Sequence, residues 1–166
     1  MELSELKDTL GNIGAIDRND SASDGLLALD VDRLIEDPIC TNSVVVDLLH
    51  LLPRNVRPEA VLSLSDDALF GFALATAAWA RFYYADPVGK RTTDGNASLE
   101  LNHGFAIPKG RKVVVVASKA DDAAQLASLV DLARACDAEV IGVMALQSSL
   151  SEKAIANVPV YALLQG

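Results

Sequence analysis

The chain has little of the chemistry that would cross-link it or hold a metal cluster, with two cysteines and two histidines among 166 residues. Cys40 and Cys136 lie far apart in apolar sequence, which excludes a disulfide framework and a cysteine-based metal cluster. We expect two reduced, buried thiols, as in a cytosolic protein. His50 and His103 have no cysteine or acid at ligand spacing, so neither of them predicts a metal site.

Positive charge is also scarce, because 14 lysines and arginines face 23 acids and leave a net charge of −9. This balance argues against binding to nucleic acid or to an anionic membrane surface. No apolar run approaches the roughly 18 residues of a membrane span, and residues 1–10 lack the apolar core of a signal peptide. We therefore expect a cytoplasmic protein, folded as one domain over residues 1–166.

The hydrophobic pattern predicts an α/β fold. An N-terminal unit (residues 1–36) combines a helix at 2–10 with a short strand at 26–31, and a helix follows at 37–53 after Asp37-Pro38. Strands and helices then alternate through a core at 60–166. The strands are expected at 60–64, 81–84, 112–116, 139–146 and 160–164, and the helices at 67–80, 121–136 and 149–156. Near-continuous Val, Ile and Leu in these strands predicts a mostly parallel twisted sheet with helices on both faces.

Two loops carry acidic pairs directly after predicted strands. They are residues 65–68 (Ser-Asp-Asp-Ala) and 117–123 (Ala-Ser-Lys-Ala-Asp-Asp-Ala). Ligands of open α/β sheets sit at the carboxyl ends of the strands, so both loops should lie at that edge. A helix N-terminus offers backbone N–H groups to a phosphate, but here carboxylates occupy the place of the anion.

The acidic pairs have three interpretations. They are ordinary helix N-caps, or Asp66, Asp67, Asp121 and Asp122 converge to bind Mg²⁺ or Ca²⁺ through oxygen, or they hold a cationic small molecule. A separate polar stretch, residues 86–104, exceeds the usual loop length and is expected to be a functional loop or a flexible hairpin.

Three segments, in this order and spacing, resemble the type I phosphoribosyltransferases, most closely orotate phosphoribosyltransferase. They are residues 26–38 (Leu-Leu-Ala-Leu-Asp-Val-Asp-Arg-Leu-Ile-Glu-Asp-Pro), the strand–helix–strand unit from Lys112 to Val143, and residues 158–164 (Val-Pro-Val-Tyr-Ala-Leu-Leu). The resemblance covers nearly the whole chain. It implies the family's fold and a homodimer, or a heterodimer with an active paralogue.

The resemblance also locates a site for phosphoribosyl pyrophosphate (PRPP), where this chain departs from the family. The family has two adjacent acids that hold the ribose, then Thr-Thr-Gly for the 5′-phosphate. Here Ala117 and Ser118 replace the acids, and residues 121–123 replace Thr-Thr-Gly. The implied ligand-binding positions are Ser65, Ser118, Lys119, Ala120, Asp121, Asp122 and Ala123. The implied catalytic-loop residues are Lys90, Arg91 and His103.

These departures predict a protein without transferase activity that senses a ligand or binds a regulatory partner. Paired carboxylates make the strongest ribose contacts, and carboxylates near a phosphate repel it. The alternative is an active PRPP-dependent transferase acting on an orotate-like nucleobase, in which Mg²⁺ bridges the phosphates to the acidic pairs. The sequence identifies no certain cofactor, Mg²⁺ or Ca²⁺ is the candidate, and the alternative function requires Mg²⁺.

Overall fold

A computed structural model describes residues 3–16, 28–88, 98–102 and 106–165. Their strands form a seven-stranded sheet in the order β3-β2-β1-β4-β5-β7-β6. The five central strands are parallel, and β3 and β6 pair antiparallel at the two edges. The strands are β1 Ala60–Leu64, β2 Arg81–Val88, β3 Ser98–Leu101, β4 Lys112–Ala120, β5 Glu139–Ser148, β6 Ala154–Ile155 and β7 Val158–Gln165.

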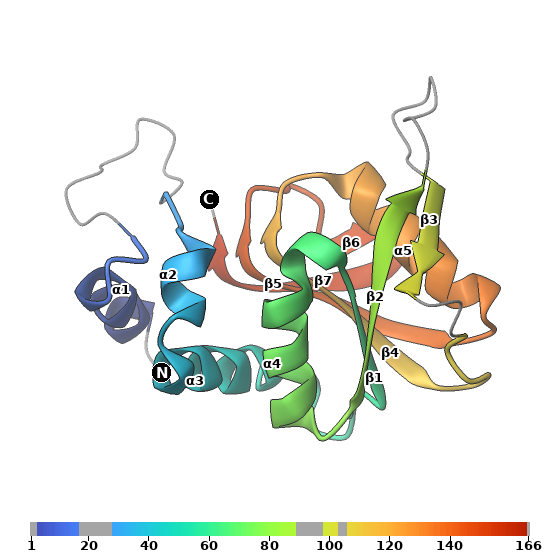
Figure 1. Cartoon of the computed structure of the whole chain (residues 1–166), viewed down its shortest axis with the longest axis horizontal. Coiled ribbons are helices and arrows are strands. Elements are labelled where there is room, and N and C mark those ends of the chain that lie inside the picture. The colour runs from blue at the N-terminus through green and yellow to red at the C-terminus, as the bar shows by residue number, and fades with distance from the viewer. Residues whose placement is uncertain (1–2, 17–27, 89–97, 103–105, 166) are drawn as a thin grey trace.

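Helices cover both faces of this sheet, as the sequence predicts (Figure 1). The helices are α1 Leu3–Asn12, α2 Val31–Ile35, α3 Pro38–Leu49, α4 Ala68–Ala78 and α5 Ala123–Ala135, with a 3₁₀ turn, η1, at Ser65–Asp67. One core packs α1, α3 and α4 on the sheet, and the other packs α5 on the opposite face. Within the described ranges, no helix combines the length and apolarity of a membrane span.

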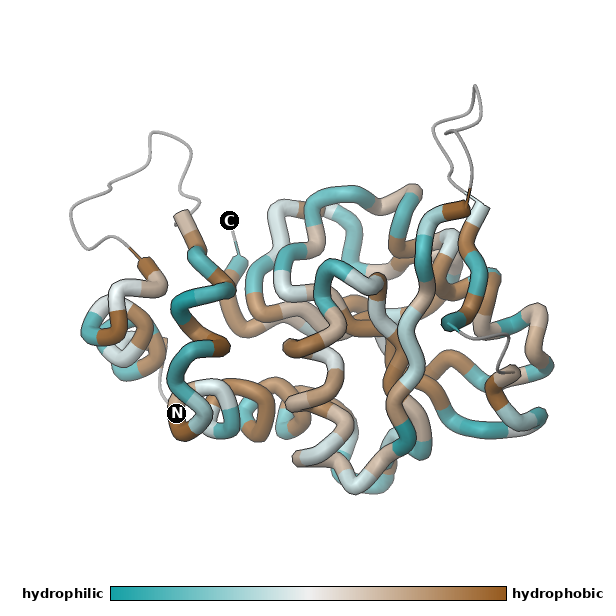
Figure 2. The backbone as a smooth tube through the Cα atoms, viewed as in Figure 1, coloured by the Kyte–Doolittle hydropathy of each residue, from teal (hydrophilic) through white to brown (hydrophobic). Residues whose placement is uncertain are grey.

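Strand β4 is buried on both faces, which explains its run of valines. Val113 and Val115 belong to the core under α5, whereas Val114 and Val116 belong to the core under α3 and α4. This alternation follows from the two-residue period of a strand. Figure 2 shows hydrophobic residues concentrated along the central strands and hydrophilic residues at the turns.

Helix α3 begins where Asp37-Pro38 predicts it. The Asp37 carboxylate accepts hydrogen bonds from the backbone N–H groups of Ile39 and Cys40, both at 3.0 Å. This side-chain cap satisfies two of the unpaired donors of the first turn. Both cysteines are free thiols, as predicted, with Cys40 buried and Cys136 half-buried.

Close packing of α4 on the sheet depends on one glycine. A Cβ atom at Gly71 would lie 2.7 Å from Phe82 Cε2 and 2.9 Å from Ser63 Oγ. Real Cβ atoms do not approach a ring carbon this closely, so an alanine here would force the Phe82 and Ser63 side chains to move. Gly71 therefore sets the distance between α4 and the edge that carries the acidic turn.

Two predicted elements are wrong. The strand expected at 26–31 is replaced, in its described part, by a single bridge from Leu29 to Ile16 followed by α2, because Asp30 caps a helix there. The helix expected at 149–156 is instead a turn and strand β6. Ala156 and Asn157 adopt positive φ angles of 47° and 62°, which reverse the chain into β7.

The stretch at 86–104 contains an antiparallel hairpin. Strand β2 continues to Val88, four residues beyond the predicted end, and pairs with β3 from Ala85↔Leu101 to Val88↔Ser98. The three residues with implied catalytic roles, Lys90, Arg91 and His103, lie outside the described residues.

Candidate functional site at the carboxyl edge of the sheet

The two acidic turns are neighbours in space, as expected from their positions after parallel strands. Strands β1 and β4 pair side by side, with Leu62 opposite Val115. The turn after β1 and the end of β4 therefore meet at the carboxyl edge of the sheet. A hydrogen bond of 2.5 Å from the Ser118 hydroxyl to Asp67 Oδ1 joins them.

A hollow of about 660 Å³ lies at this edge and is strongly acidic. Its polar lining residues are Asp30, Asp32, Asp66, Asp67, Asp121, Ser118, Lys119 and Gln125, and its apolar lining residues are Leu29, Val31, Ile35, Leu64 and Leu69. Five carboxylates thus face one cation, Lys119, whose exposed side chain makes no ion pair with the described residues. The volume suits a small molecule, and we call this hollow the acidic cavity.

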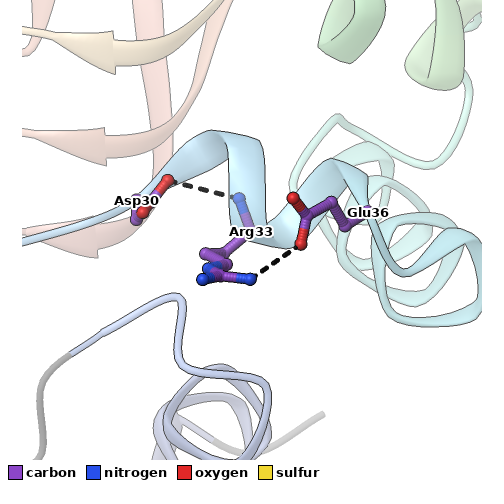
Figure 3. A network of polar contacts seen from close by, with 3 residues as sticks. All are labelled: Asp30, Arg33 and Glu36. Atoms are coloured by element: carbon purple, nitrogen blue, oxygen red, sulfur yellow. Dashed lines mark hydrogen bonds and ion pairs between the residues drawn. The ribbon is translucent and has the colours of Figure 1, made fainter.

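Helix α2 contributes two of the five carboxylates without bringing a positive charge to the acidic cavity. Asp30 accepts a hydrogen bond from the backbone N–H of Arg33 at 3.2 Å, and the Arg33 guanidinium pairs with Glu36 at 3.0 Å (Figure 3). Arg33 is therefore paired within its own helix and is not among the residues that line the cavity.

The first half of the segment resembling the PRPP loop, residues 117–120, is strand rather than loop, and only Asp121 and Asp122 connect it to α5. Strand β4 continues four residues beyond its predicted end, with Lys119 opposite Gln147 and Ala120 opposite Ser148. The Ala120 carbonyl accepts a hydrogen bond from the Ser149 N–H at 3.1 Å. A phosphate-binding loop presents several free backbone N–H groups to the anion, whereas the backbone groups of residues 117–120 that face β5 are used in sheet pairing.

The N-terminus of α5 is capped by the side chain of Asp122. Asp122 Oδ1 accepts a hydrogen bond from the Gln125 N–H at 3.0 Å, so the N-cap interpretation is confirmed for this residue. It is not confirmed for Asp67, which precedes α4 but makes no capping bond. A phosphate at α5 would have to displace the Asp122 carboxylate, which is stabilised there by the helix dipole.

Asp67 is the least solvated carboxylate of the acidic cavity. Burial raises its pKa above the ordinary value of 3.8, and repulsion from Asp66 and Asp121 adds to the increase. The hydrogen bond from Ser118 acts in the opposite direction. Crowded carboxylates without a counter-ion favour their protonated forms, so this group would gain from a bound cation.

The four predicted metal ligands do not form a prepared metal site. No group of three or more His, Cys, Asp or Glu side chains in the described ranges has an arrangement that could hold a metal ion. The physical reason is that the carboxylates have separate tasks, since Asp122 caps a helix while Asp67 pairs with a serine.

Of the residues implied to bind a ligand, Ser118, Lys119 and Asp121 line the acidic cavity. The remaining positions, Ser65, Ala120, Asp122 and Ala123, do not line it. Sequence reasoning missed Asp30 and Asp32 as members of this site. The available signal is the Asp-Val-Asp spacing before a helical turn, of which Asp30 falls in the strand predicted at 26–31 and Asp32 lies just after it.

No family model and no curated protein matches the sequence. Solved structures do match: the chain superimposes on adenine phosphoribosyltransferase from Rhodothermus marinus with a TM-score of 0.74 and 21% identity, covering 99% of this chain and 98% of that one. This chain has the type I phosphoribosyltransferase fold. The fold class and the structural resemblance predicted from the sequence are therefore confirmed.

Other phosphoribosyltransferases match at similar levels. Orotate phosphoribosyltransferase from Aeropyrum pernix gives a TM-score of 0.66 at 23% identity, covering 96% of this chain and 93% of that one. Adenine phosphoribosyltransferase from Saccharomyces cerevisiae, complexed with an imino-altritol bisphosphate and adenine, gives 0.72 at 23% identity, covering 98% of each chain. Adenine and orotate enzymes both match, so the likeness does not single out orotate.

Proposed function

We propose that this chain uses the phosphoribosyltransferase fold without the transferase reaction, as a sensor or regulatory protein that binds a cationic small molecule in the acidic cavity. The observation that carries the proposal is the lining of five carboxylates and one lysine at the place where the fold offers a ligand site. A ligand with an ammonium or guanidinium group would relieve the repulsion among Asp66, Asp67 and Asp121.

The closed phosphate positions support the same conclusion. The β4 backbone pairs with β5 up to Ala120, and Asp122 occupies the first turn of α5. A PRPP molecule placed here would bring its phosphates against carboxylates, and Lys119 is the one cation among the described residues that line the cavity. The alternative, an active transferase, requires Mg²⁺ to bridge these like charges. We test this alternative because the chain superimposes on almost the whole length of an adenine phosphoribosyltransferase.

Calorimetry tests the two functions together. We expect no heat from PRPP with or without Mg²⁺, and saturable binding of spermidine, used as a polycation probe, that weakens as salt increases. Binding of PRPP only with Mg²⁺, followed by turnover of a nucleobase, would establish the transferase instead.

A pair of matched variants locates the spermidine site. Asp121→Asn removes one charge from the acidic cavity, and Glu139→Gln removes one charge from the opposite edge of the sheet. Asp121→Asn should weaken spermidine binding several-fold, while Glu139→Gln should leave it unchanged. Equal weakening by both would mean that spermidine responds to net charge alone, which would contradict a specific site.

A further inference from the structure

A second hollow lies at the opposite end of the strands, where α4 ends and β1 begins, at the lower edge of the sheet in Figure 1. Its volume is about 590 Å³. The floor and walls are apolar and come from Leu49, Leu52, Pro53, Val56, Pro58, Ala77 and Ala78. His50, Arg54, Arg57 and Trp79 complete the lining. We call it the basic hollow.

Trp79 is held in a conformation that an ordinary tryptophan avoids. It ends α4 with a φ angle of 56°, in the left-handed region, and its side chain is 97% exposed. Helices that end this way ordinarily carry glycine at this position, because the Cβ atom of any other residue is crowded by the backbone in the left-handed region. The backbone is therefore strained at Trp79. Because the indole is exposed, its burial does not offset this strain.

Arg54 and Arg57 stand out in a protein whose net charge is −9, because both side chains are exposed. Neither side chain has a hydrogen bond or ion pair with any described residue. Both also line an adjoining hollow with Asn55, Glu59 and Lys112. The acid in that set, Glu59, already pairs with Arg111 at 2.8 Å. The Glu59 carboxylate also accepts a hydrogen bond from the Lys112 backbone N–H at 3.0 Å, and no ion pair joins it to Arg54 or Arg57.

From these observations we propose that the basic hollow binds a small planar aromatic anion, with its ring against Trp79 and its anionic group between Arg54 and Arg57. An indole face provides a stacking platform, and two free guanidiniums provide charge-assisted, bidentate donors for a phosphate or carboxylate. The apolar walls suit the remainder of a small molecule. This site is separate from the acidic cavity and independent of its ligand.

Fluorescence gives a direct test, because Trp79 is the chain's only tryptophan. Phenyl phosphate, which joins a ring to an anion, should quench the emission saturably. Inorganic phosphate has the anion without the ring, and benzyl alcohol has the ring without the anion. Each should require at least about tenfold higher concentrations to produce the same quenching. Quenching by phenyl phosphate that is linear, and equal to that of free N-acetyltryptophanamide, would overturn the proposal.

Charge-removing variants distinguish binding in the basic hollow from a response to the net charge of the protein. Arg54→Ala and Arg57→Ala should each weaken phenyl phosphate binding about tenfold, the effect of losing one charge-assisted contact. Lys109→Ala removes the same charge from a residue that pairs with Asp137 and does not line the basic hollow. An equal loss with Lys109→Ala would contradict the proposal.

Two substitutions of Trp79 separate the strain from the ring. Trp79→Gly removes both the ring and the Cβ strain, so it should raise the midpoint of urea unfolding. Trp79→Ala removes the ring but keeps the Cβ, so it should leave the midpoint near that of the native protein. Calorimetry should show phenyl phosphate binding lost in both variants. Retained binding in either would show that the ring takes no part.

Discussion

Ionisation of Asp67 in the acidic cavity makes the stability of the protein depend on pH. Its pKa is raised in the folded protein by burial first and by Asp66 and Asp121 second. A carboxyl with a raised folded pKa binds protons more readily in the native state than in the unfolded chain. Its ionisation therefore lowers stability as the pH rises from the ordinary carboxyl value through the raised one. The cost is fully present once the pH exceeds the raised pKa.

Asp67→Asn should consequently increase the free energy of unfolding at pH 7 and flatten its dependence on pH in the acid range. The amide oxygen can still accept the hydrogen bond from Ser118. Asp131→Asn, on the exposed surface of α5, is the matched control and should change neither quantity. Urea unfolding at several pH values measures both. A less stable Asp67→Asn protein at pH 7 would show that the carboxylate is favourably placed.

At the scale of elements, the two aspartates before α5 have different tasks although they are adjacent. Asp122 accepts a hydrogen bond from the first turn of the helix. Asp121 is exposed and faces the acidic cavity. The sequence alone offers no way to divide these tasks between two identical neighbours.

Asp122→Ala should therefore destabilise the protein by about 1 kcal/mol, the ordinary value of a side-chain N-cap. Asp121→Ala should leave stability unchanged or raise it slightly, because it relieves repulsion in the acidic cavity. Denaturant unfolding of the two variants side by side gives the comparison. Equal losses would indicate that both carboxylates serve the helix.

The elements differ in how far the sequence could predict them. The valines of β4 require burial on both faces, so the strand and its parallel neighbours could be predicted from pattern alone. Its continuation through Ala120 could not, because the Ala-Ser-Lys-Ala segment has no strong strand preference and is held by pairing with β5. Similarly, Ser118 and Asp121 could be predicted from the sequence as residues of the site. Asp30 could not, because only the packing of α2 places it in the lining of the acidic cavity.

At the scale of the whole molecule, the sheet separates charge along its strands. Carboxylates gather at the carboxyl edge in the acidic cavity, and arginines gather at the amino edge around the basic hollow. Apolar side chains are exposed on the helical face between them, with Leu69 66% and Phe72 58% exposed on α4. An exposed apolar pair on one helix face is a common feature of association surfaces.

The family resemblance implies a homodimer, or a heterodimer with an active paralogue, and we propose that Leu69 and Phe72 lie in that interface. Phe72→Gln together with Leu69→Gln should shift a dimer to the 17.5 kDa mass of one chain in light scattering. Leu3→Gln, at a comparably exposed position on α1, should not. A native protein that is already monomeric at high concentration would contradict self-association and leave a related chain as the expected partner.

The continuation of β4 beside β5 also has a consequence for motion. The Ala120 backbone faces β5, where its carbonyl accepts a hydrogen bond from the Ser149 N–H, so the Ala120 amide proton should exchange with solvent far more slowly than one in an open loop. A rim fixed in this way cannot fold over a ligand from this side. The acidic cavity would then select its ligand by a shape that exists before binding, with little ordering entropy lost on association. This edge of the sheet therefore recognises its ligand with a rigid surface.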